Sequence, residues 1–491
     1  MLRKRATMPT MTATEPFDAA FSSPEESDAQ RLHELGYEQE LKRSMGIFDC
    51  VAMGFATISP VVGLYAVVLV GMVVAGAAWV WVLPVALAGQ CLLIAVYSEL
   101  AGKFPLANGA YQWSRRLVGP RYGWFNGWVA LCAYAVANTT IAYAGAFWAL
   151  ALLAITPTPT ALVTAGAVLV AICSLVNAIG VDALRGALRL GVGAEAIASV
   201  CIGVALLLVF REQDFSVLFD TFGAEARSGG STFAALLAAL AVGGWAFIGF
   251  DATVAAAEET RGAARHVPRA IWIALLSVGG LVILNAFATT LAHPDPAAVA
   301  AGQDIDPVST AVASAFGDSA SKPFAAIVLL AFLACGMAAQ GATARGIYSV
   351  ARDGVLPGSE LLRRVDRRQV PIGGIVAVTL IAWAGLLLGL EATAIGSLIT
   401  FGTAAIFVSF LLTASAALYA RGQGVLPRSG MLVNVLAVAW LAFETVNIAW
   451  PRASLATAGA PWYQLWAAPM VVAAITVIGL AYLALARPTV H

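Results

Sequence analysis

The stretch GGWAFIGFD, from Gly243 to Asp251, lies in the middle of an apolar run that extends from about residue 233 to residue 256. It places three glycines and one carboxylate at the depth where a membrane helix is normally unbroken and uncharged. A carboxylate in hydrocarbon is costly and usually faces a cavity or a partner. The stretch therefore favours an interrupted helix that lines a cavity, with a glycine-rich packing face and a paired Asp251 as the alternative.

A second irregular stretch, ISPVVG from Ile58 to Gly63, lies inside the first apolar run of the chain. Proline lacks an N–H group and clashes with the preceding turn of a helix. Main-chain groups freed in lipid must find partners, so such a break is tolerated where it lines a cavity. A simple proline kink is the alternative interpretation of this stretch alone.

The two irregular stretches together indicate more than either does alone. Each lies roughly 13 or 14 residues into its apolar run, and five predicted helices separate them. Helices that lie an odd number of places apart in the chain cross the membrane in opposite directions. Two interrupted helices in this relation are typical of inverted repeats with the ligand site at the interruptions. Broken helix ends offer N–H groups that suit a carboxylate and carbonyls that suit an ammonium, so a zwitterion would satisfy both.

Composition places the whole chain in a membrane. Of its 491 residues 60% are hydrophobic and only 11% are charged, against about a quarter in soluble proteins. The formal net charge of zero gives no reason to expect a nucleic-acid partner. Spans of roughly 20 apolar residues suffice to cross a bilayer. Twelve qualify, at about 46–73, 78–102, 123–152, 160–179, 187–210, 233–256, 269–292, 323–349, 371–390, 393–418, 431–450 and 464–486.

These spans predict an all-α integral membrane fold of twelve transmembrane helices with a five-plus-five inverted repeat. We expect a polar tail over residues 1–45, disordered up to about residue 30. The first repeat covers 46–210, the second 233–418, and two peripheral helices follow at 431–486. If the N-terminus is cytoplasmic, only four of the 28 basic residues fall outside, namely Arg211, Arg227, Lys322 and Arg452. The positive-inside rule then predicts a multi-pass protein of the cell membrane with both termini cytoplasmic.

Few residues offer chemistry for an enzyme. None of the four histidines lies inside an apolar run, and the six cysteines show no ligand-like spacing. We therefore expect no catalytic residue, no metal and no cofactor. An integral-membrane enzyme is the weakest of three classes, and a transporter-like sensor without net transport would be expected to carry a long cytosolic extension. A secondary carrier fits the sequence best.

Several motifs resemble the amino acid–polyamine–organocation superfamily, and in particular its amino acid/choline transporter branch with the 4-aminobutyrate permeases. They are LGYEQELKRSMG (Leu35 to Gly46), ISPVVGLY (Ile58 to Tyr65), SELAGKFPLANGAYQWSRRLVGPRYGWFNGW (Ser98 to Trp128), GFDATVAAAEETRGAARHVPRAI (Gly249 to Ile271) and ARDGVLPGS (Ala351 to Ser359). The resemblance runs from about Leu35 to the end of the last predicted helix. It implies the same inverted-repeat fold and a permease that uses neither a cofactor nor ATP.

The resemblance also implies where substrate binds. Members of this superfamily bind it at the two interrupted helices, and an indole stacks on substrate where Trp245 stands here. The implied binding residues are Ile58, Ser59, Val62 and Gly63 in the first interruption and Trp245, Ala246, Phe247, Ile248, Gly249 and Phe250 in the second. Asp251 could attract a cation or act in gating. Candidate substrates are 4-aminobutyrate, a neutral α-amino acid, choline and a polyamine, and the branch favours the first two.

Glu195 is the candidate for energy coupling. It stands about eight residues into the fifth predicted helix, where relatives carry Lys or Glu, and no basic residue is closer along the chain than Arg189. A buried glutamate can bind and release a proton when its surroundings favour the neutral form, so a proton is a possible co-substrate. A structural carboxylate, sodium ligation and exchange remain open, as do the oligomeric state and gating by Glu258 and Glu259.

Overall fold

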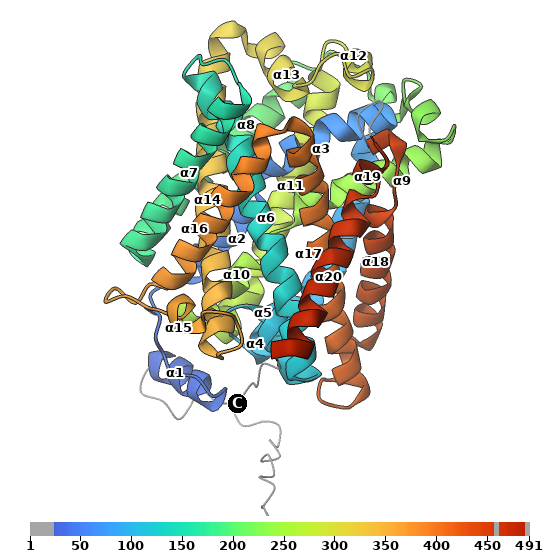
Figure 1. The fold of residues 1–491 in the computed structure, drawn as a ribbon. Coiled ribbons are helices and arrows are strands. Elements are labelled where there is room, and N and C mark those ends of the chain that lie inside the picture. Colours follow the sequence, from blue (N-terminus) through green and yellow to red (C-terminus); the bar gives the residue numbers. More distant parts are fainter. Residues whose placement is uncertain (1–23, 456–460, 487–491) are drawn as a thin grey trace, which may run out of the picture.

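The computed structural model describes residues 24–455 and 461–486, excepting the side chains of residues 24–27 and 392–401. Within these residues the chain forms helices alone, and the only β-type pairing is an isolated bridge between Met45 and Thr260. The predicted all-α membrane fold is confirmed. Figure 1 shows a bundle with α1 and α15 at one end, which we name the α1 end, and with α12 and α13 at the other, the α13 end.

The chain order of the helices gives the bundle its layout. The first half contains α1 (Pro24–Glu34), α2 (Ile47–Ile58), α3 (Pro60–Ala75), α4 (Val82–Lys103), α5 (Gly109–Leu117), α6 (Pro120–Leu152), α7 (Pro159–Ile179), α8 (Val181–Leu208), α9 (Thr232–Gly243) and α10 (Ala252–Ala255). The second half contains α11 (Ala263–Ala292), α12 (Pro296–Ala300), α13 (Pro307–Phe316), α14 (Ser321–Arg352), α15 (Ser359–Leu362), α16 (Ile372–Leu386), α17 (Ala392–Gly422), α18 (Met431–Ala449), α19 (Trp462–Leu465) and α20 (Ala467–Ala486).

Eleven helical stretches in the described residues are long and apolar enough to cross a membrane, where the sequence predicted twelve. The first stretch, Ile47–Lys103, is 57 residues long and contains the first two predicted helices. A straight helix of that length would extend about 86 Å, far beyond the ~30 Å of hydrocarbon. The short 3-10 helix η2 (Gly76–Trp81) lies inside it, between α3 and α4.

Three local expectations were wrong. Disorder was expected up to about residue 30, of which residues 1–23 lie outside the described residues; from Pro24 the chain is helical, because the Asp28 carboxylate accepts from the Gly262 N–H at 2.6 Å and anchors α1 to the α1 end. Helix α5 occupies part of a predicted loop. Helix α8 begins directly after α7, since Gly180 with φ of +131° turns the chain in one residue.

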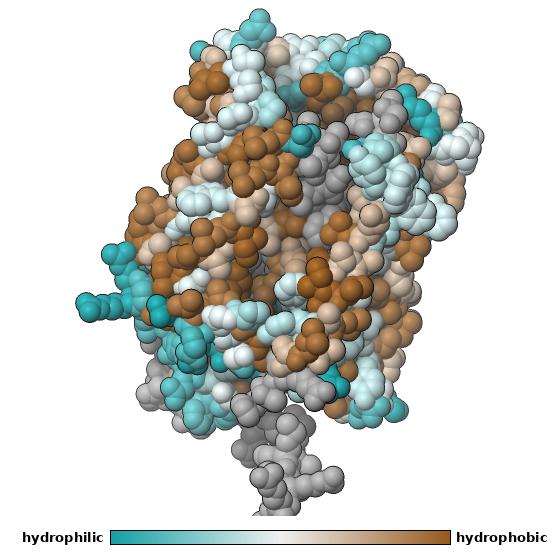
Figure 2. Space-filling model, viewed as in Figure 1, coloured by the Kyte–Doolittle hydropathy of each residue, from teal (hydrophilic) through white to brown (hydrophobic). Residues whose placement is uncertain are grey.

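Apolar side chains cover the outside of the bundle. Figure 2 shows hydrophobic residues over the middle of the visible face and hydrophilic ones gathered toward its ends. Exposed leucines, isoleucines and valines line α7, α8, α16, α18 and α20, as a bilayer requires. Exposed aromatic residues stand beside α20, where amphipathic rings suit a membrane–water interface: Trp462, Tyr463 and Trp466.

Both predicted interruptions are present. Ser59 separates α2 from α3 with φ of +52°, and its hydroxyl caps α3 by accepting from the Val62 N–H at 3.1 Å. After α9 the chain forms the 3-10 helix η5 (Gly244–Phe247) and becomes extended at Ile248. It then passes through Gly249 at φ of +113° before α10.

The two interruptions pack against each other through glycines. A Cβ on Gly63 would stand 3.1 Å from the Ala246 carbonyl oxygen, and one on Gly249 would stand 3.0 Å from the Thr57 carbonyl oxygen. Backbone therefore approaches backbone at two points. This contact brings segments nearly 190 residues apart in the chain together in the middle of the bundle.

Candidate functional site

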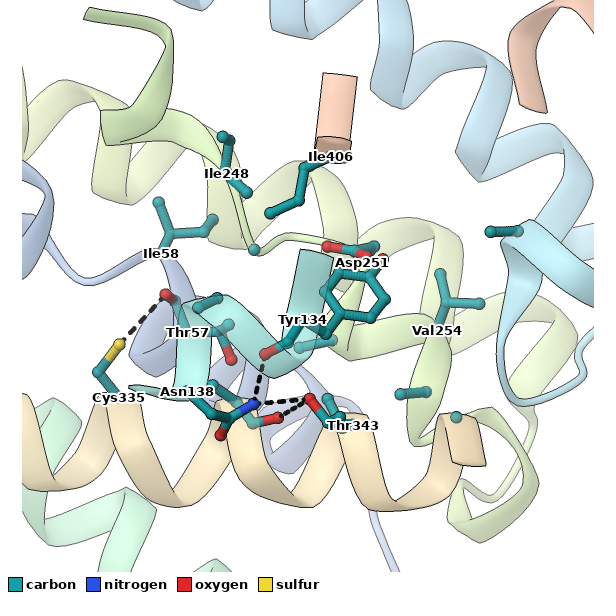
Figure 3. Close-up of a pocket in the computed structure, with 18 of the residues that line it drawn as sticks. Thr57, Ile58, Tyr134, Asn138, Ile248, Asp251, Val254, Cys335, Thr343 and Ile406 are labelled. Atoms are coloured by element: carbon teal, nitrogen blue, oxygen red, sulfur yellow. Dashed lines mark hydrogen bonds between the residues drawn. The ribbon is translucent and has the colours of Figure 1, made fainter. Parts of the chain in front are cut away.

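A cavity of about 80 Å³ lies where the two interrupted helices face α6 and α14. Figure 3 shows Ile58, Ile248 and Ile406 on one side of it and Tyr134, Asn138 and Thr343 on another. Asp251 lies beside the Tyr134 ring. The cavity thus has an apolar wall and a polar wall, with one carboxylate at its edge.

Six of the twelve residues singled out from the sequence line this cavity: Ile58, Val62, Trp245, Ile248, Gly249 and Asp251. The other six lie around it. Ser59 and Glu195 lie behind the first interruption, Gly63 contacts the backbone of Ala246, and Ala246, Phe247 and Phe250 are fully buried. The Phe250 ring stacks on Phe410 with centroids 5.3 Å apart. These six residues shape and support the cavity walls.

Asp251 is held by a neighbouring helix. Its Oδ2 accepts a hydrogen bond from the Tyr134 hydroxyl on α6. One turn along α6, the Asn138 amide donates to the Tyr134 carbonyl at 2.8 Å and to Thr343 Oγ1 on α14 at 2.9 Å. These bonds tie α6, α14 and the second interruption into one polar wall.

Glu195 is bonded directly to the first interruption. Its Oε1 accepts from the Ser59 hydroxyl at 2.5 Å and from the Val61 N–H at 3.0 Å. No charged residue close to Glu195 along the chain could have indicated these partners. The actual partners are a hydroxyl and an amide from a segment about 135 residues away. Arg189, by contrast, donates to Asp49 at 2.7 Å.

Buried ion pairs close the α1 end below the cavity. Arg345 pairs with Glu259 at 2.6 Å, and Arg352 pairs with Glu258 at 2.7 Å. The side chains of all four are at most 8% exposed, so these acids form buried pairs and not solvated ones. A third pair joins Arg421 on α17 to Glu99 on α4. Removing one partner of such a pair leaves a buried charge and costs about 3–5 kcal/mol.

The segment that precedes α2 lies across the same closure. The Glu259 carbonyl accepts from the N–H groups of both Ser44 and Met45 at 2.9 Å, and the Glu258 carbonyl accepts from the Gln39 amide. The Arg352 guanidinium stands 3.8 Å from the centre of the Tyr37 ring, close enough for a cation–π contact. Burial, followed by the nearby Asp353 carboxylate, raises the pKa of the Tyr37 phenol, which therefore stays protonated and can donate to Asp353.

Several cavity residues were missed from the sequence. Most of them come from unbroken helices, and the polar ones among them are Thr57, Tyr97, Asn108, Tyr134, Asn138 and Thr343. One signal was available: Tyr134 and Asn138 are four residues apart in an apolar run, which places both on one face of a helix.

A family model described as amino acid permease matches residues 46–475, which includes both interruptions and most of the cavity lining.

The chain belongs to the amino acid permease family. Three relatives illustrate its range. Amino-acid permease BAT1 of Arabidopsis thaliana is 24% identical and covers 95% of this chain and 96% of its own. Branched-chain amino acid permease BcaP of Bacillus subtilis is 26% identical over 84% and 90%. Low-affinity putrescine importer PlaP of Escherichia coli is 25% identical over 79% and 81%.

Membership confirms the superfamily that the motifs resembled, and it makes this permease a multi-pass membrane transporter for amino acids or amines rather than an enzyme. No group of three or more His, Cys, Asp or Glu within the described residues could hold a metal ion.

Proposed function

We propose that this permease is a secondary active transporter that carries an amino acid or small amine by alternating access around the cavity between its two interrupted helices. The observation that carries the proposal is the meeting of both interruptions at one cavity edged by Asp251. Residues at the interruptions bind the substrate or shape its site. The positive-inside rule supports a cell-membrane protein with both termini and the α1 end in the cytoplasm.

Substrate can reach the cavity from the α1 end only after the buried ion pairs at that end separate. The pairs Arg345–Glu259 and Arg352–Glu258 tie α14 to the segment that follows α10. Separating them exposes the charges to water, which solvates each and reduces the cost of breaking the pair. Movement of the second interruption relative to α14 would then open the cavity toward the cytoplasm.

Proton coupling through Glu195 is the second part of the proposal. One carboxylate oxygen holds the Ser59 hydroxyl and the Val61 amide, while Oε2 is buried and has no hydrogen-bond partner in the described chain. Hydrogen bonds to an ionised acceptor are stronger than those to a neutral one. A proton bound at Glu195 therefore weakens its hold on the first interruption, which links the proton to the conformation of a cavity wall.

Counterflow tests the transport proposal. Proteoliposomes containing the purified permease are preloaded with single amino acids or amines, and entry of the same labelled compound is followed. We expect entry above that of empty liposomes for at least one compound. Binding without any counterflow would favour the sensor alternative, and neither binding nor counterflow across amino acids, polyamines and choline would contradict the proposed function.

A further inference from the structure

The polar wall of the cavity has few free hydrogen-bond donors. The Tyr134 hydroxyl donates to Asp251, and both N–H groups of the Asn138 amide donate to protein oxygens. The Thr57 and Thr343 hydroxyls each donate to the carbonyl four residues earlier, at 2.8 Å. What these side chains offer a ligand is oxygen acceptors, chiefly the Asp251 carboxylate and the Asn138 amide oxygen.

The charge of the cavity also favours a cation over an anion. Asp251 is the only charged residue among the described residues that line it. The described lining contains no Lys or Arg, and residues 392–401, whose side chains lie outside the description, contain none in sequence. A ligand carboxylate would meet a like charge and no opposing cation, whereas an ammonium would meet an opposite charge at low dielectric.

The N–H groups at the start of α3 are already used. A helix N-terminus with free N–H groups can hold a carboxylate, and α3 begins beside the cavity at Pro60. Pro60 has no N–H, Val61 donates to Glu195, and Val62 donates to the Ser59 hydroxyl. From behind the first interruption, the Glu195 carboxylate thus takes up an N–H group that could otherwise bind a substrate carboxylate.

We propose that the preferred substrate is a primary amine cation without a carboxylate, with its ammonium on Asp251. An ammonium brings three donors to the oxygen acceptors of the polar wall and to its one carboxylate. The apolar wall of Ile58, Ile248 and Ile406 receives the carbon chain. This inference rests on the proposed function, and it reverses the preference for amino acids that the sequence motifs implied.

Calorimetric titration of the purified permease tests the inference with ligands that share a skeleton: n-butylamine, 1,4-diaminobutane and 4-aminobutyrate, then isobutylamine and valine. We expect at least one four-carbon amine to bind tenfold or more tightly than 4-aminobutyrate, and isobutylamine to bind more tightly than valine. Equal or tighter binding of the carboxylate-bearing partner in either set would overturn the inference. That outcome would leave a functional amino acid permease, whereas absence of all counterflow would contradict the proposed function itself.

Variants locate the selectivity. Asp251→Asn removes the charge with little change in shape and should weaken amine binding at least tenfold. Asp251→Glu keeps the charge and should bind amines more tightly than Asp251→Asn does. Glu360→Gln removes an acid that is 81% exposed at the α1 end and should bind like the wild type. Melting midpoints show whether each variant folds. Unchanged amine affinity in folded Asp251→Asn would overturn the assignment of the ammonium to Asp251.

Discussion

Gly249→Ala is the sharpest test of how the two interruptions meet. Gly249 has φ of +113°, a region that residues with a Cβ rarely adopt. A Cβ there would stand 2.8 Å from Thr57 Cγ2 and 3.0 Å from the Thr57 carbonyl carbon and oxygen. Two of these contacts are with backbone, which cannot rotate away, so the interruptions must separate.

Two costs set the magnitude. A non-glycine residue in a sparsely populated backbone region costs roughly 1–3 kcal/mol, and overpacking a close contact costs a further 1–3 kcal/mol or so. Even the lower sum, about 2 kcal/mol, reduces the equilibrium ratio of the native arrangement to separated ones about thirtyfold at 1.4 kcal/mol per factor of ten. Because an alternating carrier holds its arrangements close in free energy, we expect uptake by Gly249→Ala to fall by about that factor.

The assay is initial uptake into proteoliposomes, corrected for the amount of folded permease by its melting curve in detergent. Gly280→Ala is the matched control, because Gly280 lies within α11 and a Cβ there meets no atom within 4 Å. That variant should transport normally, with stability unchanged or raised by about 0.5–1 kcal/mol. Uptake by folded Gly249→Ala within a few-fold of the wild type would refute the geometric reasoning.

Three further predictions follow from the same structure. Glu195→Gln should keep counterflow but lose accumulation driven by a pH gradient, because no proton can be released; continued accumulation would make Glu195 a structural carboxylate. Arg352→Ala leaves Glu258 buried without its partner, which costs about 3–5 kcal/mol and should loosen the α1 end. A cysteine introduced at cavity residue Ala342 should then react faster with a thiol reagent added from that end; an unchanged rate would argue against a gate. A cysteine at Ser321 should react with an impermeant maleimide from outside intact cells and one at Ser359 should not; the opposite result would reverse the orientation.

The sequence predicted the interruptions because their causes are local. Proline and glycine act on their own backbone, so Pro60 and Gly249 were recognisable without knowledge of their neighbours. The left-handed φ of +52° at Ser59 was not foreseeable, because a serine adopts it only when other groups hold it in place. Here the Glu195 carboxylate does so.

The other half of the cavity depends on contacts between distant segments. Tyr134 and Asn138 stand in an unbroken helix, where composition gives no sign that they face Asp251 and Thr343. The anchoring of α1 likewise depends on a bond from Gly262, more than 230 residues away. Sequence patterns locate the places where a helix must break, and only the packing of helices decides which side chains meet there.

The most direct test of the account is to fill the cavity. Ala339 on α14 lines it and is 7% exposed, whereas Val376 on α16 is 51% exposed on the outside of the bundle. Counterflow of the best substrate should be abolished in Ala339→Phe, because a phenyl ring at this lining residue would project into the cavity, and retained in Val376→Phe. Wild-type counterflow by folded Ala339→Phe would contradict the claim that substrate passes between the two interrupted helices.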